Sequence, residues 1–90
     1  MLGSWSARLL LAERFFENLK AGLESVGADF SHVVKFSIFM LDISQIPVVR
    51  SVRDQYVNTA QPPASSAFEV RKLFRDDVLI EIEAIAAVPL

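Results

Sequence analysis

The 90-residue sequence contains no cysteine, one histidine and only three glycines. Without cysteine there is no disulfide framework, no thiolate nucleophile and no thiol-based zinc site. Gly3, Gly22 and Gly27 lie too far apart to form a glycine-rich phosphate-binding loop. The lone histidine, His32, has no neighbouring metal ligands, so we predict a structural role for it and no metal site.

Long apolar runs and an excess of one charge are also missing. Leu9–Ala12 is the longest apolar run near the start, and Glu13 ends it well short of a signal peptide or a membrane span. The net charge is −2 with mixed signs along the chain, which argues against a nucleic-acid partner. We therefore predict a cytoplasmic protein that binds neither membranes nor nucleic acid.

Hydrophobic residues, in contrast, make up 52% of the chain. A domain of this size buries only about 60–65% of the surface that its unfolded chain exposes. Part of the apolar surface is therefore expected in a subunit interface, the alternative being an aggregation-prone fragment. The length fits one domain, residues 1–90, and leaves no room for a second.

Hydrophobic periodicity predicts an α+β fold in the order helix, strand, helix, strand, strand. The expected helices and strands, from spacings of three to four and of two, are helices 7–26 and 45–58 and strands 33–41, 62–70 and 79–86. The helix between the first two strands predicts a parallel crossover, and the short turn near Arg75 predicts an antiparallel hairpin for the last two. Two helices covering one face of a mixed sheet complete the architecture.

Two finer expectations concern side chains. In the first strand, the predicted buried face consists of Val34, Phe36, Ile38 and Met40. In the second helix, Arg50 and Asp54 are one turn apart and are expected to pair on the outside.

The last strand carries an unusual pair of acids. Glu81 and Glu83 lie on one face of it, about 7 Å apart, and acidic residues are depleted in strands. This Glu-x-Glu segment is therefore where function is sought first. The alternative is that the two acids form cross-strand ion pairs with Lys35, Arg71 or Lys72.

Several short motifs occur in a fixed order along the chain, and they are Asn18–Ala21, Val33–Lys35, Phe39–Asp42, Pro62–Ala64 and Ile80–Ala86. In this order they resemble the reactive-intermediate deaminase family, called RidA or YjgF, from about Glu13 to Val88. The resemblance implies a chorismate-mutase-like (YjgF-like) fold, a six-stranded sheet backed by two helices. It also implies homotrimers that bind a small-molecule ligand in clefts between subunits.

The family's N-terminal strands have no counterpart in residues 1–12. We therefore expect an N-terminally truncated domain with one sheet edge unpaired. Either the chain is a truncated form or its start lies inside a longer reading frame, and we favour the longer frame.

The resemblance also assigns roles to individual residues. Glu81 falls on the family's acidic residue, which positions or deprotonates the water that attacks an imine carbon, so Glu81 is the expected catalytic residue. Ser65 stands where the family has an arginine that clamps the substrate carboxylate. An arginine introduced at position 65 is expected to lie beside Glu81. Ser66 keeps the lining polar, and Arg50 either restores positive charge to the cleft or faces solvent beside Asp54.

The function implied by the resemblance is hydrolytic deamination of small enamines or imines, with release of ammonia. No metal or organic cofactor is needed, because an imine carbon is already electrophilic. Ser65 in place of the arginine favours the alternative, a non-catalytic member of the fold that binds a small metabolite or acts as a regulator. An endoribonuclease activity, described for some relatives, gains little support from the acidic balance of the chain.

Overall fold

The computed structural model describes the backbone of residues 3–88 and the side chains of residues 9–88. The elements in chain order are α1 (Gly3–Ser25), the 3-10 helix η1 (Phe30–His32), β1 (Val33–Met40), the 3-10 helix η2 (Ile43–Gln45), α2 (Ile46–Arg53), β2 (Ala64–Glu69) and β3 (Ile80–Ala86). The predicted α+β class and order of the elements are confirmed. Within residues 3–88, no helix has both the length and the apolar character needed to cross a membrane.

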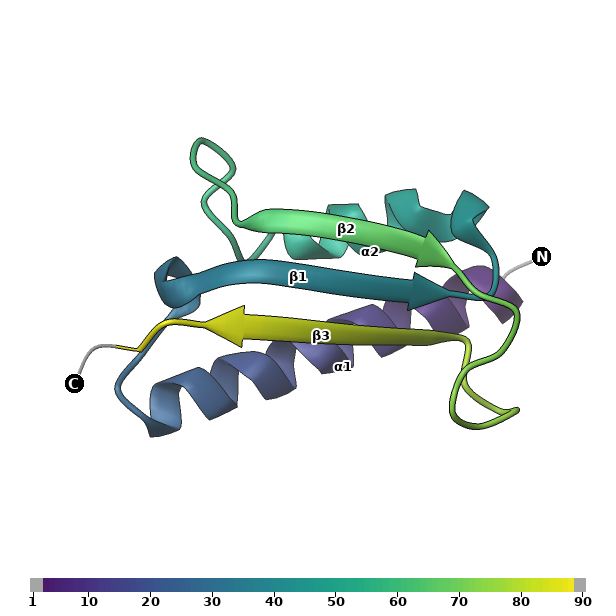
Figure 1. The fold of residues 1–90 in the computed structure, drawn as a ribbon, viewed down its shortest axis with the longest axis horizontal. Coiled ribbons are helices and arrows are strands. Elements are labelled where there is room, and N and C mark those ends of the chain that lie inside the picture. Colours follow the sequence, from purple (N-terminus) through teal and green to yellow (C-terminus); the bar gives the residue numbers. More distant parts are fainter. Residues whose placement is uncertain (1–2, 89–90) are drawn as a thin grey trace.

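The three strands form one mixed sheet in the spatial order β2-β1-β3. β1 runs parallel to β2, with Phe36 opposite Ser65, so the predicted crossover is confirmed. The predicted hairpin is wrong, because β3 pairs antiparallel with the other edge of β1, with Met40 opposite Ile80. Segment 70–79 carries the chain past the end of β1 (Figure 1). That position brings Ile80 and Ile82 of β3 under the helices, where they join the core.

Both helices cover the same face of the sheet, and the opposite face is open (Figure 1). The core fills the space between the helices and the sheet. Its most deeply buried large side chains come from both helices and the central strand, and they are Phe16 of α1, Phe36 and Met40 of β1, and Val49 and Val52 of α2. Phe16 is at the centre, with its ring stacked on Tyr56 at 5.3 Å and edge-on to Phe36 at 5.5 Å.

An irregularity at the start of β1 changes which of two adjacent valines is buried. The pairing of β1 with β3 shifts register between Val33 and Lys35. A shift of one residue turns a side chain to the other face of the sheet. Val33 is therefore buried and Val34 is 50% exposed, which makes the predicted burial of Val34 wrong. The predicted burial of the remaining positions, Phe36, Ile38 and Met40, is confirmed.

The helix boundaries differ from the predicted ones. α1 begins at Gly3, upstream of the predicted start at residue 7. The second helix, α2, begins at Ile46, directly after η2, and ends at Arg53, which is five residues before the predicted end at residue 58. Beyond it, the amides of Gln55 and Tyr56 bond to carbonyls three residues back, which tightens the chain into turns.

Gly27 ends the α1 region in a left-handed conformation, with φ of 73°. Such a conformation costs an L-residue roughly 1–2 kcal/mol, although a methyl group at Gly27 would meet no atom within 4 Å. We expect Gly27→Ala to lower the free energy of unfolding by about 1 kcal/mol. Gly22→Ala is the matched control, because Gly22 is helical and its surroundings are equally open.

For Gly22→Ala we expect the opposite sign, a gain of roughly 0.5–1 kcal/mol, because alanine loses less entropy than glycine in a helix. Urea unfolding of the two variants and the wild type measures both effects. Equal shifts in the same direction would contradict the conformational argument.

Candidate functional site

The open face of the sheet presents side chains in three cross-strand rows. The row nearest the end of β1 consists of Glu81, Phe39 and Phe68, contributed by β3, β1 and β2. The rings of Phe39 and Phe68 stack with centroids 5.5 Å apart, and Phe68 is 49% exposed. The Glu81 carboxylate therefore lies at one end of an aromatic surface, half-buried and accessible from outside.

The next two rows change in character. The middle row is polar and consists of Glu83, Ser37 and Ser66; the last consists of Ile85, Lys35 and Ala64. The predicted polar lining by Ser66 is thus on the same face as Glu81, one row away. Neither acid forms an ion pair with any residue that the structure describes, so the pairing with Lys35, Arg71 or Lys72 is wrong.

Ser65 points to the other face of the sheet, toward α2. It is opposite Phe36, whose side chain is buried under the helices. The Nη1 atom of Arg53 donates a hydrogen bond to the Ser65 hydroxyl at 3.3 Å. Arg53 comes from the last turn of α2, and only 18% of its side chain is exposed.

Arg50 lies one turn earlier on α2, and its side chain is exposed. The predicted pairing of Arg50 with Asp54 is wrong, because Asp54 instead accepts hydrogen bonds from Nε and Nη2 of Arg53, at 3.1 and 3.0 Å. The spacing of the two arginines was the signal that could have identified Arg53. Residues three apart on a helix lie on the same side of it, so by spacing alone both arginines are candidates for a contact with the edge of β2.

Glu81 and Ser65 do not meet within one chain. Their partners on β1 are Phe39 and Phe36, which separates them by about 10 Å along the strand. They also lie two strands apart, about another 10 Å, and on opposite faces. The expectation that an arginine at position 65 lies beside Glu81 concerns a cleft between subunits, and it stays a prediction. Any site that uses both must take them from different subunits.

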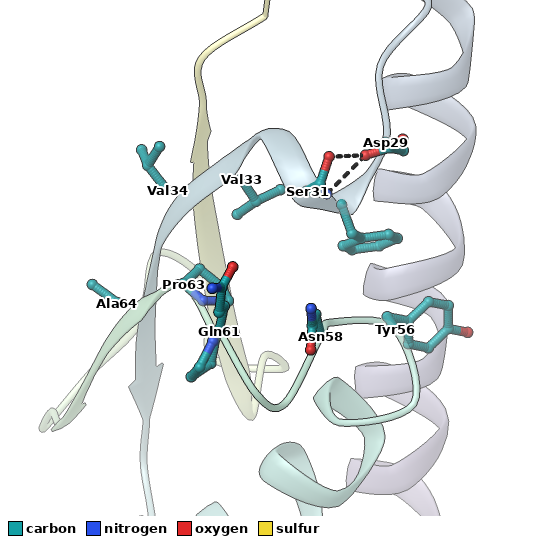
Figure 2. A pocket seen from close by; sticks show the side chains of 11 residues that line it. Asp29, Ser31, Val33, Val34, Tyr56, Asn58, Gln61, Pro63 and Ala64 are labelled. Carbon is teal, nitrogen blue, oxygen red and sulfur yellow. Dashed lines mark hydrogen bonds between the residues drawn. The ribbon is translucent and has the colours of Figure 1, made fainter.

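A separate groove of about 620 Å³ lies at the other end of the sheet, between η1 and the segment that leads into β2. Figure 2 shows Asn58 and Gln61 on this segment, across from the η1 turn. The walls also include aromatic and proline side chains, which are Phe30, Tyr56, Pro62 and Pro63. Ala64 joins the groove to the start of β2, one residue before Ser65.

The η1 turn at the rim of the groove is held by its own side chains. Asp29 accepts hydrogen bonds from the hydroxyl and the backbone amide of Ser31 (Figure 2), and these bonds hold the pKa of Asp29 below its usual value. Nδ1 of His32 accepts a bond from the Asp29 amide at 3.0 Å. His32 is therefore part of a capping box. Among the described residues no cluster of three or more potential metal ligands occurs.

Tyr56 connects this region to α1. Its hydroxyl donates a hydrogen bond to Oε2 of Glu17, and its ring stacks on Phe16. The bond to Glu17, together with desolvation and the negative charges of Glu17 and Glu13, raises the pKa of Tyr56 to about 12.

Tyr56 is the only tyrosine in the chain, so its ionisation can be followed directly. We expect an ultraviolet pH titration to give a pKa of about 12 in the folded protein and a value nearer 10 for the Glu17→Gln variant. Because the folded-state pKa is raised, the stabilisation is complete below pH 10 and is lost as the pH rises through 12. Glu24→Gln, on an exposed part of α1, is the control and leaves the titration unchanged. Identical titrations for wild type and Glu17→Gln would contradict the assigned bond.

Comparison with known proteins gives consistent matches over most of the chain. A sequence profile of the family described as endoribonuclease L-PSP matches residues 11–88. The chain is 45% identical over 75 residues to protein DfrA of Myxococcus xanthus, covering 83% of this chain. It is 36% identical over 77 residues to 2-iminobutanoate/2-iminopropanoate deaminase of Salmonella typhimurium, again covering 83% of this chain.

A solved structure agrees with the fold. The crystal structure of RidA from an Antarctic Psychrobacter species superposes with a TM-score of 0.75, at 34% sequence identity over 86% of this chain. The match covers 61% of that protein. The chain likewise spans only 56% and 59% of the lengths of the Myxococcus and Salmonella proteins.

Proposed function

The chain belongs to the endoribonuclease L-PSP family, also known as RidA or YjgF, and we propose that it hydrolyses small imines and enamines to carbonyl compounds and ammonia. The observation that carries the proposal is the position of Glu81, an accessible carboxylate beside the Phe39–Phe68 stack with no ion-pair partner among the described residues. The similarity to a protein named 2-iminobutanoate/2-iminopropanoate deaminase supports this choice of chemistry.

In the proposed reaction, an enamine first tautomerises to its imine. Water then attacks the C=N carbon, a C–O bond forms, and Glu81 accepts the proton that the water loses. The nitrogen takes up a proton, and the resulting carbinolamine expels ammonia as the C–N bond breaks and the carbonyl forms. Each turnover consumes one water and one imine and returns Glu81 to its starting state, so no metal or organic cofactor is required.

The second part of the proposed site comes from a neighbouring subunit. The separation of Glu81 and Ser65 within one chain supports this part of the proposal. Exposed apolar side chains on the open face support association, since Val34, Phe68 and Ile85 are 50, 49 and 60% exposed. Following the family resemblance, we propose a homotrimer with ligand clefts between subunits.

One chain has a mass of 10.0 kDa, and light scattering at micromolar concentration is expected to give three times that mass. Association buries apolar side chains that one small domain leaves in water. A stable, folded monomer at that concentration would contradict the assembly. Phe68→Glu, on the open face, is expected to weaken the trimer, and Phe74→Glu, in the loop after β2, is the control.

The alternative proposal is a non-catalytic protein that binds a small metabolite in the same cleft. The presence of Ser65 on β2 favours it, because a hydroxyl carries no charge with which to hold a substrate carboxylate. Ribonuclease activity is not proposed, although the family bears the name endoribonuclease L-PSP. The net charge of −2, and two glutamates against one lysine on the open face, disfavour a polyanion there. The cytoplasm is the proposed compartment.

A direct assay separates the two proposals. The substrate is 2-iminobutanoate, generated in the cuvette by oxidation of the amino acid, and the measured quantity is the rate of ammonia release above that in buffer. The deaminase proposal expects an acceleration that rises in proportion to protein concentration. No acceleration together with saturable binding of 2-oxobutanoate, the product acid, would contradict it and favour the non-catalytic alternative.

A further inference from the structure

The contact between Arg53 and Ser65 places a positive charge at the edge of β2 by an indirect route. The strand itself contributes only a hydroxyl, while the guanidinium reaches it from the last turn of α2. Arg53 is largely buried, with 18% of its side chain exposed, whereas Arg50 on the same helix is exposed. The contact therefore fixes one arginine, and not the other, against the sheet.

Arg53 keeps hydrogen-bonding capacity for a ligand. Its Nε and Nη2 donate to Asp54, and its Nη1 donates to Ser65. A guanidinium has more N–H groups than these bonds use, and each terminal nitrogen carries a second hydrogen. Asp54 accepts both of its bonds from one side of the planar guanidinium, so the orientation of the guanidinium is set in advance of binding. This lowers the entropy cost of holding an anion.

The charges near this contact favour an anion. Arg53 brings a guanidinium to the sheet, and the carboxylate of Asp54, 46% exposed, is screened by solvent; Arg50 is exposed as well and adds little at this point. Glu69, further along the same face of β2, is engaged by the amide of Ile43. The hydroxyl of Ser65 adds a neutral donor beside the guanidinium, since it can accept from Arg53 and still donate its own hydrogen.

We propose that Arg53 and Ser65 together form a subsite for the carboxylate of a small organic acid, with the charge supplied by the helix instead of the strand. This inference rests on the proposed function and deepens it, because it names the side chains that hold a substrate carboxylate. It also provides, from α2, the positive charge that the Ser65 hydroxyl lacks. Arg53, and not Arg50, determines this specificity.

The test measures binding of 2-oxobutanoate to isotope-labelled protein by NMR, with its methyl ester as the uncharged probe. In the wild type we expect saturable shifts of the Ser65 amide and of the Arg53 Nε–H signal, with the ester binding about tenfold more weakly or worse. Arg53→Gln is expected to raise the Kd of the acid at least about tenfold and to abolish the preference for acid over ester. Arg50→Gln is the matched control and changes the Kd by less than about twofold.

Three results would overturn the subsite: no saturable shifts in the wild type, equal binding of the acid by wild type and Arg53→Gln, or equal losses in Arg53→Gln and Arg50→Gln. Arg53→Lys guards against a folding defect, because it keeps the charge but not the planar fork and is expected to bind with intermediate affinity. If acid binding depends on Arg53 but no variant releases ammonia, the subsite stands and the deaminase proposal fails. If wild type and Arg53→Gln turn over 2-iminobutanoate with equal kcat/KM, the deaminase stands and the subsite fails.

Discussion

Glu81→Gln is expected to slow the turnover of 2-iminobutanoate by about 100-fold or more, which is the low end of what a positioned general base contributes. Glutamine has nearly the same shape as glutamate but cannot accept the proton that water loses as the C–O bond forms. Because Glu81 makes no ion pair with a described residue, the substitution removes no such contact from the chain. The fold, followed by circular dichroism, is expected to be unchanged.

Glu83→Gln is the matched control for this prediction. Glu83 is on the same strand and the same face, one row from Glu81, beside Ser37 instead of Phe39. A change of rate below about threefold is expected for it, since it lacks the aromatic neighbour that defines the proposed site. Equal losses in the two variants would show that the face needs negative charge in general, and would remove Glu81 from the catalytic role.

Mixing two defective proteins locates the site between subunits. If Glu81 of one subunit works with Arg53 of the next, refolding Glu81→Gln together with Arg53→Gln restores some intact sites. In randomly mixed rings, about a quarter of the interfaces pair an intact Glu81 with an intact Arg53. Recovery of activity in the mixture, at low substrate concentration, is therefore expected. No recovery would contradict a shared site.

Phe16→Ala is expected to lower the free energy of unfolding by about 3–5 kcal/mol. Phe16 is 1% exposed, and its ring contacts those of Phe15, Phe30, Phe36 and Tyr56, at centroid distances of 5.1 to 6.3 Å. The substitution leaves a cavity where α1, β1 and the chain after α2 meet. For a small domain with a total stability of roughly 5–13 kcal/mol, this is a large share.

Phe74→Ala is the control for the core prediction, because Phe74 is 72% exposed in the loop between β2 and β3. Its expected effect is within about 0.5 kcal/mol. Urea unfolding at neutral pH measures both variants. A loss below about 1 kcal/mol for Phe16→Ala would contradict its placement at the centre of the core.

The pattern of apolar residues predicted most of the fold because burial follows periodicity. The faces of β3 were predicted correctly, since Ile80 and Ile82 alternate strictly with Glu81 and Glu83. Val34 was assigned wrongly because a register shift leaves no trace in composition; Val33 and Val34 are chemically identical, and only the pairing decides which is buried. The predicted hairpin of β2 and β3 was wrong for a related reason. A turn signal between two strands does not reveal whether a third strand, here β1, lies between them in the sheet.

The candidate site was predicted only in part. Glu81 and Ser66 were placed on one face by alternation alone, and the structure has them so. Arg53 was missed because the resemblance to the family indicated Arg50 as the arginine near the cleft, although both arginines occupy the same turn of α2. The choice between them depends on how far the helix lies from the edge of β2, which is a tertiary distance. Sequence spacing on a helix cannot supply it.

The central position of β1 has a consequence for how the chain folds. Both of its ladders join it to segments distant in sequence, Ala64–Glu69 and Ile80–Ala86, and the described sheet contains no hairpin. A turn therefore cannot start the sheet, and each ladder forms only after a long loop has closed. Until β3 arrives, one edge of β1 presents its amides and carbonyls to any other chain nearby. Association of incomplete chains through this edge competes with folding, and expression at low temperature and low concentration favours the native pairing.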